Sequence, residues 1–128
     1  MKKLLLLYCI TIVFHFTYAQ DKIKSFKLIT PDPLQYKKTE FEIEISAAFK
    51  NPYISSDIKL DMILTSPSGK EVFLPCFYFS GDPVLSFWKA RFTACEAGVY
   101  SYYFRLSRDI SASIISDTSS FTATASTR

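Results

Sequence analysis

The sequence predicts an all-β domain, built as a two-sheet sandwich of about seven strands. Three observations carry this prediction. Short segments that alternate between apolar and polar residues recur along the chain, and turn residues separate them roughly every 8 to 12 residues. No longer stretch has the apolar spacing of an amphipathic helix.

Residues 1–19 stand apart from this pattern because they have the three parts of a secretory signal peptide. A basic start is followed by an apolar run over residues 4–16 and by small residues ahead of Gln20. The apolar run is shorter than the roughly 20 residues that span a bilayer. We therefore expect cleavage before Gln20 and a single domain over residues 20–128, secreted or periplasmic and without membrane contact.

The first predicted strands lie in the N-terminal half of this domain. Residues 23–29 precede a loop with two prolines, and residues 41–49 alternate between apolar residues and glutamate or small residues. Residues 58–65 alternate in the same way. The following Ser-Pro-Ser-Gly run (66–69) has proline and glycine where a tight turn needs them, so it predicts a hairpin into the next strand.

The next predicted strand, residues 71–79, is apolar on both faces. One face carries Val72, Leu74, Cys76 and Tyr78, and the other carries Phe73, Phe77 and Phe79. Pro75 has no N–H to donate to a ladder, which indicates a sheet edge or a bulge at this point.

The remaining strands follow two further turns. Residues 85–93 form a hairpin with the preceding strand, and residues 99–106 show the most regular alternation of the chain. Residues 120–125 complete about seven strands, and residues 110–115 can add a short one.

The charge of the mature domain argues against nucleic-acid binding. The signal contains two of the 15 Lys and Arg residues, which leaves 13 basic against 12 acidic residues and a formal charge of +1. No basic cluster is longer than Lys37-Lys38, so the electrostatic footprint of a nucleic-acid binder is missing.

The residues needed for catalysis are also missing. The only histidine, His15, lies in the signal, so the mature domain has no histidine to act as a general base or zinc ligand. Glu42 and Glu44 lie about 7 Å apart on one strand face, where they are better interpreted as a solvated face than as a catalytic pair. The aspartates are scattered, without a calcium loop. We expect a domain that is not an enzyme and that has no cofactor or metal.

The sequence does not decide whether Cys76 and Cys95 form a disulfide. An exported domain with two cysteines invites a bridge. The hairpin register, however, places Cys95 about seven residues, or roughly 20 Å, beyond the residue that pairs near Cys76, which is further than a disulfide reaches. The unbridged state is favoured, and a bridge would need a bulge at Pro75 and a chain reversal after Thr93.

Aromatic residues are frequent, and one cluster allows two interpretations. The cluster comprises Phe73, Phe77, Tyr78, Phe79, Phe87 and Trp88. It is either ordinary sandwich core, which strands that are apolar on both faces favour, or a surface for glycan or a protein partner. The residues proposed for such a contact are Phe77, Tyr78, Phe79 and Trp88.

One motif resembles immunoglobulin-like domains. Residues 96–102, Glu-Ala-Gly-Val-Tyr-Ser-Tyr, are similar to their acid-x-Gly-x-Tyr-x-Cys run. The resemblance implies structural roles for Gly98 and for Tyr100, whose hydroxyl would anchor a backbone group as a tyrosine corner. Tyr102 stands where antibody domains have their second cysteine, so their inter-sheet disulfide is not expected here.

A closer resemblance covers roughly residues 34–125. It is to the immunoglobulin-like domain of unknown function that follows the signal peptide in many secreted bacterial glycoside hydrolases, N-terminal to their barrel catalytic domain. The segments that carry the resemblance are 36–43, 77–81, 88–92 and 96–102. It implies a non-catalytic accessory module of polysaccharide degradation, with a glycoside hydrolase catalytic domain or a polysaccharide as partner. The alternative is a structural, adhesion or protein-interaction sandwich at the cell surface that uses an exposed sheet edge.

Overall fold

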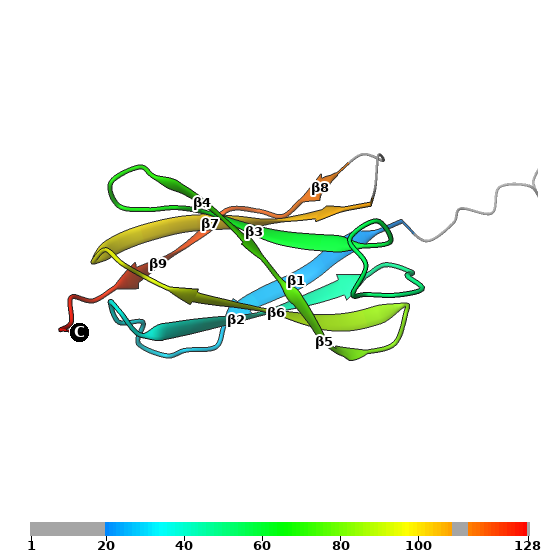
Figure 1. Cartoon of the computed structure of the whole chain (residues 1–128), viewed down its shortest axis with the longest axis horizontal. Coiled ribbons are helices and arrows are strands. Elements are labelled where there is room, and N and C mark those ends of the chain that lie inside the picture. Colours follow the sequence, from blue (N-terminus) through cyan, green and yellow to red (C-terminus); the bar gives the residue numbers. More distant parts are fainter. Residues whose placement is uncertain (1–19, 109–112, 128) are drawn as a thin grey trace, which may run out of the picture.

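Two antiparallel sheets pack face to face in the computed structural model, which describes residues 20–108 and 113–127 (Figure 1). The strands are β1 (Lys22–Leu28), β2 (Lys38–Ser46), β3 (Lys59–Thr65), β4 (Glu71–Pro75), β5 (Phe77–Gly81), β6 (Leu85–Thr93), β7 (Gly98–Ser107), β8 (Ile114–Ile115) and β9 (Ser119–Ala123). The described residues contain no helix, and hence none that could cross a bilayer. The predicted all-β sandwich is confirmed.

The order of the strands is that of an immunoglobulin-like domain. One sheet has the order β1-β2-β6-β5, and the other has β4-β3-β7, with β8 and β9 both paired to the far side of β7. Immunoglobulin domains place strands A, B, E and D in one sheet and C, F and G in the other. In those terms β1, β2, β6 and β5 are A, B, E and D, β3, β7 and β9 are C, F and G, and β4 is an extra edge strand.

The predicted strand 71–79 is in fact two strands in different sheets. β4 pairs with β3 up to Pro75, Cys76 donates its backbone N–H to the carbonyl of Leu60 at 2.8 Å, and β5 then pairs with β6. In Figure 1 this segment crosses diagonally from one sheet to the other. The prediction of one strand was wrong, although the expected sheet edge at Pro75 is present. We term residues 71–81 the strand switch.

Other differences from the predicted elements are smaller. β2 starts and ends three residues earlier than the predicted 41–49, yet Ala47 and Phe49 beyond its end are still buried. β8 covers only the last two residues of the predicted 110–115, and residues 109–112 are outside the described part of the chain. The predicted signal peptide, residues 1–19 with His15, is also outside it.

The core forms from the inward residues of both sheets, as their alternation requires. Phe41 of β2 and Tyr102 of β7 meet across the sandwich with ring centroids 5.0 Å apart. Immunoglobulin domains of antibodies join these same two strands by a disulfide. Here an aromatic contact occupies that place, and Phe121 of β9 packs against both rings.

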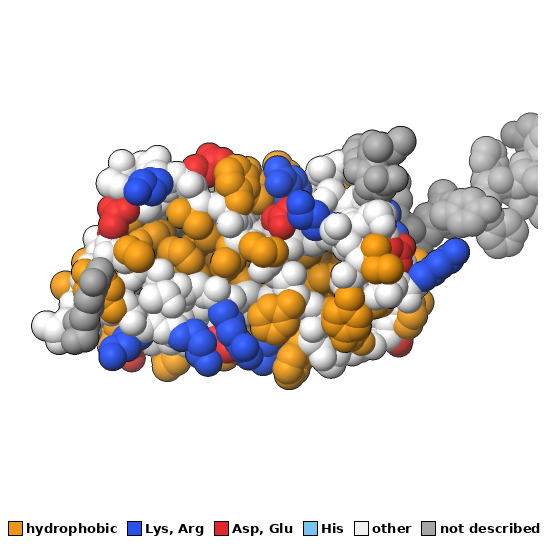
Figure 2. Space-filling view, viewed as in Figure 1, with side chains coloured by type: hydrophobic (Ala, Val, Ile, Leu, Met, Phe, Trp, Pro, Cys, Tyr) orange, Lys and Arg blue, Asp and Glu red, His pale blue; other side chains and the backbone are white. Residues whose placement is uncertain are grey.

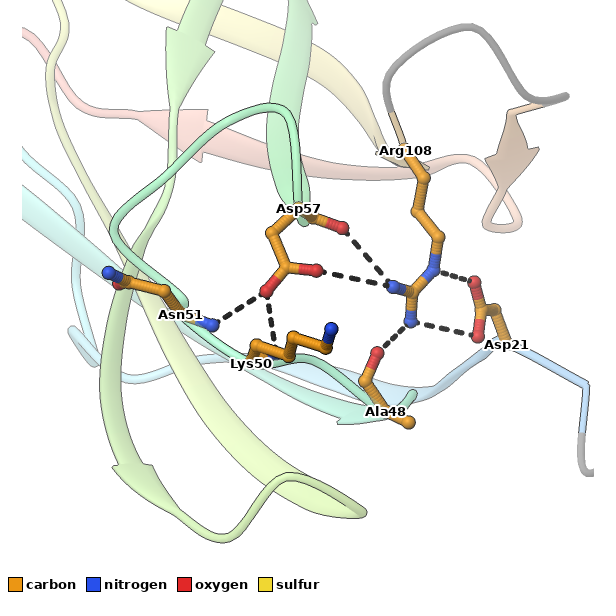
Figure 3. Close-up of polar contacts among 6 residues, drawn as sticks. All are labelled: Asp21, Ala48, Lys50, Asn51, Asp57 and Arg108. Carbon is orange, nitrogen blue, oxygen red and sulfur yellow. Dashed lines mark hydrogen bonds and ion pairs between the residues drawn. The ribbon is translucent and has the colours of Figure 1, made fainter.

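Arg108, directly after β7, forms hydrogen bonds with two other segments of the chain at one end of the sandwich (Figure 3). Its guanidinium donates two hydrogen bonds to the Asp21 carboxylate ahead of β1, and further ones to backbone carbonyls of the β2–β3 loop, including that of Asp57. The Asp57 carboxylate in turn accepts the backbone N–H groups of Lys50 and Asn51, each at 2.6 Å. These bonds, that of Asn51 first, lower the pKa of Asp57, and the Arg108 charge acts in the same direction.

Candidate functional site

The four residues proposed for glycan or partner contact lie on opposite faces of their sheet. Trp88 is 2% exposed, and its indole N–H donates to the Ser86 hydroxyl at 2.9 Å inside the core. Tyr78 points the same way, with its ring 6.0 Å from that of Trp88. Phe77 and Phe79 point outward and are 38% and 53% exposed. The four side chains therefore do not form one surface.

The outward pair is part of a mixed aromatic and charged surface on β5, β6 and β2. Lys89 Nζ lies 3.8 Å from the ring centroid of Phe79, and the Arg91 guanidinium carbon lies 5.0 Å from that of Phe77. Glu40 of β2 accepts from both cations, at 3.1 Å from Lys89 and 3.3 Å from Arg91. We term these five residues the outer aromatic surface.

Two local features produce this surface. A bulge in the β5–β6 ladder falls at Phe79, and bulges of this kind commonly re-aim a side chain at a sheet edge. The hydrogen bond from Lys89 lowers the pKa of Glu40, and Arg91 adds to that effect, so the carboxylate stays charged between them at neutral pH.

The core interpretation of the aromatic cluster is thus correct for some of its members and wrong for others. Trp88 is buried and Tyr78 is half-buried against the core, whereas Phe77 and Phe79 are exposed. Phe73 is 58% exposed on the outer face of the other sheet, with the Arg105 guanidinium 5.9 Å from its ring centroid. The period-two pattern separated Tyr78 from Phe77 and Phe79 correctly, but it was wrong to place Phe73 on the same face as those two rings, because β4 and β5 belong to different sheets.

A groove opens beside the strand switch. β5 pairs with β6 only over residues 86–89 of β6. Beyond that point β6 continues to Thr93 with only β2 as a neighbour, because β4 lies in the other sheet. The groove has a volume of about 460 Å³ and is lined by Ser66, Ser68, Lys70, Val72, Phe92, Thr93, Cys95, Glu96 and Tyr100. Figure 2, drawn from the side of the switch, shows hydrophobic side chains between the two sheets and charged side chains on the strands above and below them. We term it the switch groove.

The rim of the switch groove carries a hydrogen-bonded polar array. The hydroxyls of Ser66 and Ser68 are 3.1 Å apart, and Ser68 donates to the Glu96 carboxylate at 3.0 Å. The backbone N–H of Lys70 donates to the Ser66 hydroxyl at 3.0 Å. Hydrogen bonding from Ser66 and then Ser68 lowers the pKa of Glu96, and the Lys70 charge adds to this, so Glu96 is ionised at neutral pH.

Tyr100 and Gly98 fix the turn that forms one wall of the groove. The Tyr100 hydroxyl accepts the backbone N–H of Glu96 at 3.1 Å and donates to the carbonyl of the same residue at 3.3 Å, which is the backbone anchor expected of a tyrosine corner. Burial raises the pKa of Tyr100. Gly98 has φ +130°, and a Cβ there would lie 2.9 Å from the Pro67 side chain, so the turn needs glycine.

Cys76 and Cys95 are both free, so the disulfide between them that the sequence left undecided is not formed in the structure. Cys76 lies at the crossing of the strand switch, next to the Phe77–Lys89 pair, and Cys95 lies six residues beyond Lys89 along the chain. Six residues of extended strand span roughly 20 Å. Burial, with Asp61 nearby, raises the pKa of the Cys76 thiol, while Cys95 is exposed at the groove rim.

Sequence reasoning did not find the switch groove, because its walls come from residues about 30 positions apart that the pairing of β3 with β7 brings together. The one local signal was the Glu-Ala-Gly-Val-Tyr run, which located Tyr100 and Gly98 but gave no sign of a cavity. Over the described residues, no three His, Cys, Asp or Glu side chains gather in a way that could hold a metal ion.

Solved structures with a similar fold come from a much larger protein. A crystal structure of the uncharacterized protein lmo2446 from Listeria monocytogenes EGD-e, in complex with α-D-glucose, β-D-glucose, magnesium and calcium, matches with a TM-score of 0.61 and 14% identity over 80% of this chain. A second structure of that protein matches with a TM-score of 0.58 and 15% identity over 76% of this chain. In both cases the match covers 9% of the Listeria chain, and at this identity the likeness is one of fold.

No curated protein sequence matches the chain. The sequence profile of a family described as a domain of unknown function, DUF5060, does match, over residues 33–107. That range is more than half of the chain and runs from the loop before β2 to the end of β7. The protein therefore belongs to the DUF5060 family.

Proposed function

We propose that this domain is a non-catalytic accessory module of secreted polysaccharide degradation, and that its outer aromatic surface packs against a glycan-degrading protein. The observation that carries the proposal is the exposure of Phe77 and Phe79 side by side on an edge strand. Phenylalanine and arginine are enriched in protein interfaces, while grouped exposed aromatics are unusual on a surface without a partner.

The arrangement of this surface favours a protein partner over a sugar. A sugar stacks its C–H face on the flat face of an aromatic ring, but here Lys89 and Arg91 already lie over the rings of Phe79 and Phe77. Glu40 holds both cations in place. The edges of the two phenylalanine rings suit the aromatic or hydrophobic centre of a protein interface. The partly neutralised charges around them suit its polar rim.

A sequence resemblance and one structural comparison support polysaccharide as the context. Four segments of the sequence resemble domains that precede the barrel of secreted glycoside hydrolases. A protein with a similarly folded part was crystallised with glucose. The non-catalytic half of the proposal rests on the sequence, because the only histidine lies in the predicted signal.

Site-specific photo-cross-linking tests the proposal. A benzoylphenylalanine at position 79 should form a cross-link with a glycoside hydrolase when the protein is exported by the organism that encodes it, and mass spectrometry identifies the cross-linked protein. The matched control is the same group at position 73, also an exposed phenylalanine but on the opposite sheet. Equal capture at both positions, or no capture at position 79, overturns the proposal.

A second candidate is a protein-interaction or adhesion module that pairs through a sheet edge. It is favoured by the free edges of β4 and β5, each of which is paired on one side only. If the protein cross-linked at position 79 is an adhesin or cell-envelope protein, the second candidate replaces the first.

A further inference from the structure

We propose that the switch groove is a binding site for a neutral saccharide unit, separate from the outer aromatic surface. This inference deepens the proposed function and rests on it for the expected glycan context. The groove volume of about 460 Å³ falls in the range of small-molecule sites, roughly 300 to 1,000 Å³. It accommodates a sugar ring together with part of a neighbouring one.

The floor of the groove is apolar and held in place. Val72 and Phe92 are half-buried and pack on the core, while Tyr100 is 2% exposed. The Phe92 ring meets that of Tyr100 edge to face at 5.3 Å and that of Phe121 at 6.5 Å. Such a floor suits the C–H face of a sugar, and because its rings are fixed by the core, little side-chain entropy is lost on binding.

The rim carries the groups that would meet hydroxyls. Glu96 is an ionised acceptor, Lys70 is a donor, and Ser68 and Thr93 have hydroxyls that can donate and accept. Because one carboxylate and one ammonium lie on the same rim, neither a strongly anionic nor a strongly cationic ligand is favoured. A neutral molecule with several hydroxyls, such as a sugar, can satisfy both groups.

The rim is also preorganised. The bonds from Lys70 N–H to Ser66, between Ser66 and Ser68, and from Ser68 to Glu96 form a continuous chain along one edge. The Glu96 backbone is anchored separately by the Tyr100 hydroxyl. Its side chain can therefore be changed without removing the tyrosine corner, which makes Glu96 a suitable position for a test.

The test is an NMR titration of the ¹⁵N-labelled protein with cellotetraose, xylotetraose, mannotetraose and laminaritetraose. At least one of them should produce saturable shifts at the amides of Ser66, Lys70, Thr93 and Glu96. Glu96→Gln should weaken that binding about tenfold, the loss of one charge-assisted hydrogen bond. Glu42→Gln, which changes a carboxylate on an outer strand face, should leave the affinity unchanged.

The outcomes separate this inference from the proposed function. The absence of shifts with all four sugars at millimolar concentration overturns the groove site, and so does equal weakening by Glu96→Gln and Glu42→Gln. Tighter binding of tetragalacturonate, an acidic sugar, overturns the neutral class. Shifts confined to Phe77 and Phe79 overturn the groove while leaving a glycan contact elsewhere. Failure of the cross-link at position 79 removes the docking proposal without affecting the titration.

Discussion

The middle of the sandwich and the strand switch share the same alternation of inward and outward residues, but their outward residues differ in type and exposure. In β2 and β7 the inward positions, such as Ile43 and Phe104, are fully buried, and the outward positions are polar or only partly covered. In the switch the inward positions are again covered, but the outward ones are the exposed Phe73, Phe77 and Phe79. Burial explains the residues of the middle strands, but it does not explain these three outward rings.

The two regions also differ in how their backbones are held. β2 and β7 have hydrogen-bonded neighbours on both sides, whereas β4 pairs only with β3 and β5 only with β6. Strands with one free edge open more easily than central strands. We therefore expect the middle to determine the stability of the domain and the switch to present its contact surfaces, which substitutions in each region can test.

Removing a ring from the middle should have the largest effect. Phe41 is fully buried between the sheets, so Phe41→Ala should lower the free energy of unfolding by about 3 to 5 kcal/mol. Phe79→Ala, at a position 53% exposed, should cost at most about 1 kcal/mol. Urea denaturation measures both. Similar losses for the two variants would mean that the switch is as much a part of the core as β2.

Changing the turn next to the groove should have the second-largest effect. Gly98→Ala forces a side chain into a left-handed conformation and against Pro67, so we expect a loss of about 2 to 3 kcal/mol. Gly69→Ala, where φ is +88° and no atom lies within 4 Å of the added carbon, should cost about 1 kcal/mol. Equal denaturation midpoints for the two variants would contradict the close contact between the turns.

The tyrosine corner should contribute less. Tyr100→Phe removes the acceptor for the Glu96 backbone N–H and should destabilise the domain by about 1 kcal/mol. Tyr53→Phe, at a position 78% exposed, should leave stability unchanged. An unchanged denaturation midpoint for Tyr100→Phe would show that the tyrosine corner does not stabilise this turn.

The acid dependence should show the smallest effect. Asp57 has a lowered pKa in the folded state, so its stabilising contribution is present above the unfolded value of about 3.9 and is lost as the pH falls through the folded value. The wild-type protein should lose more stability between pH 7 and acidic pH than Asp57→Asn does. Asp32→Asn, in the exposed part of the β1–β2 loop, should follow the wild type. Identical acid profiles for all three proteins would contradict the lowered pKa.

The predictable parts of the fold were those that local sequence determines. Alternation located β2, β3, β6 and β7 to within a few residues, and the Glu-Ala-Gly-Val-Tyr run indicated both the need for Gly98 and the backbone anchor of Tyr100. Each of these features depends on neighbouring residues and on one repeated spacing, so a single sequence contains enough information.

The strand switch was not predictable in the same way. The apolar pattern runs without interruption through Pro75 and Cys76, and a period of two says which residues share a face but not which sheet a strand joins. Residues that are apolar on both faces are typical of buried strands, so the exposure of Phe77 and Phe79 went against the usual rule. The contact between Ser68 and Glu96 joins two turns 28 residues apart, and no local signal indicates it.

The strand switch also links the two sheets directly through the backbone. Here one short run of backbone, Pro75 to Phe77, passes directly from a ladder in one sheet to a ladder in the other. A load applied at Phe77 by a docked protein would pull on β4, whose Val72 lines the groove. Tension on one surface would then reach the other through a few covalent bonds.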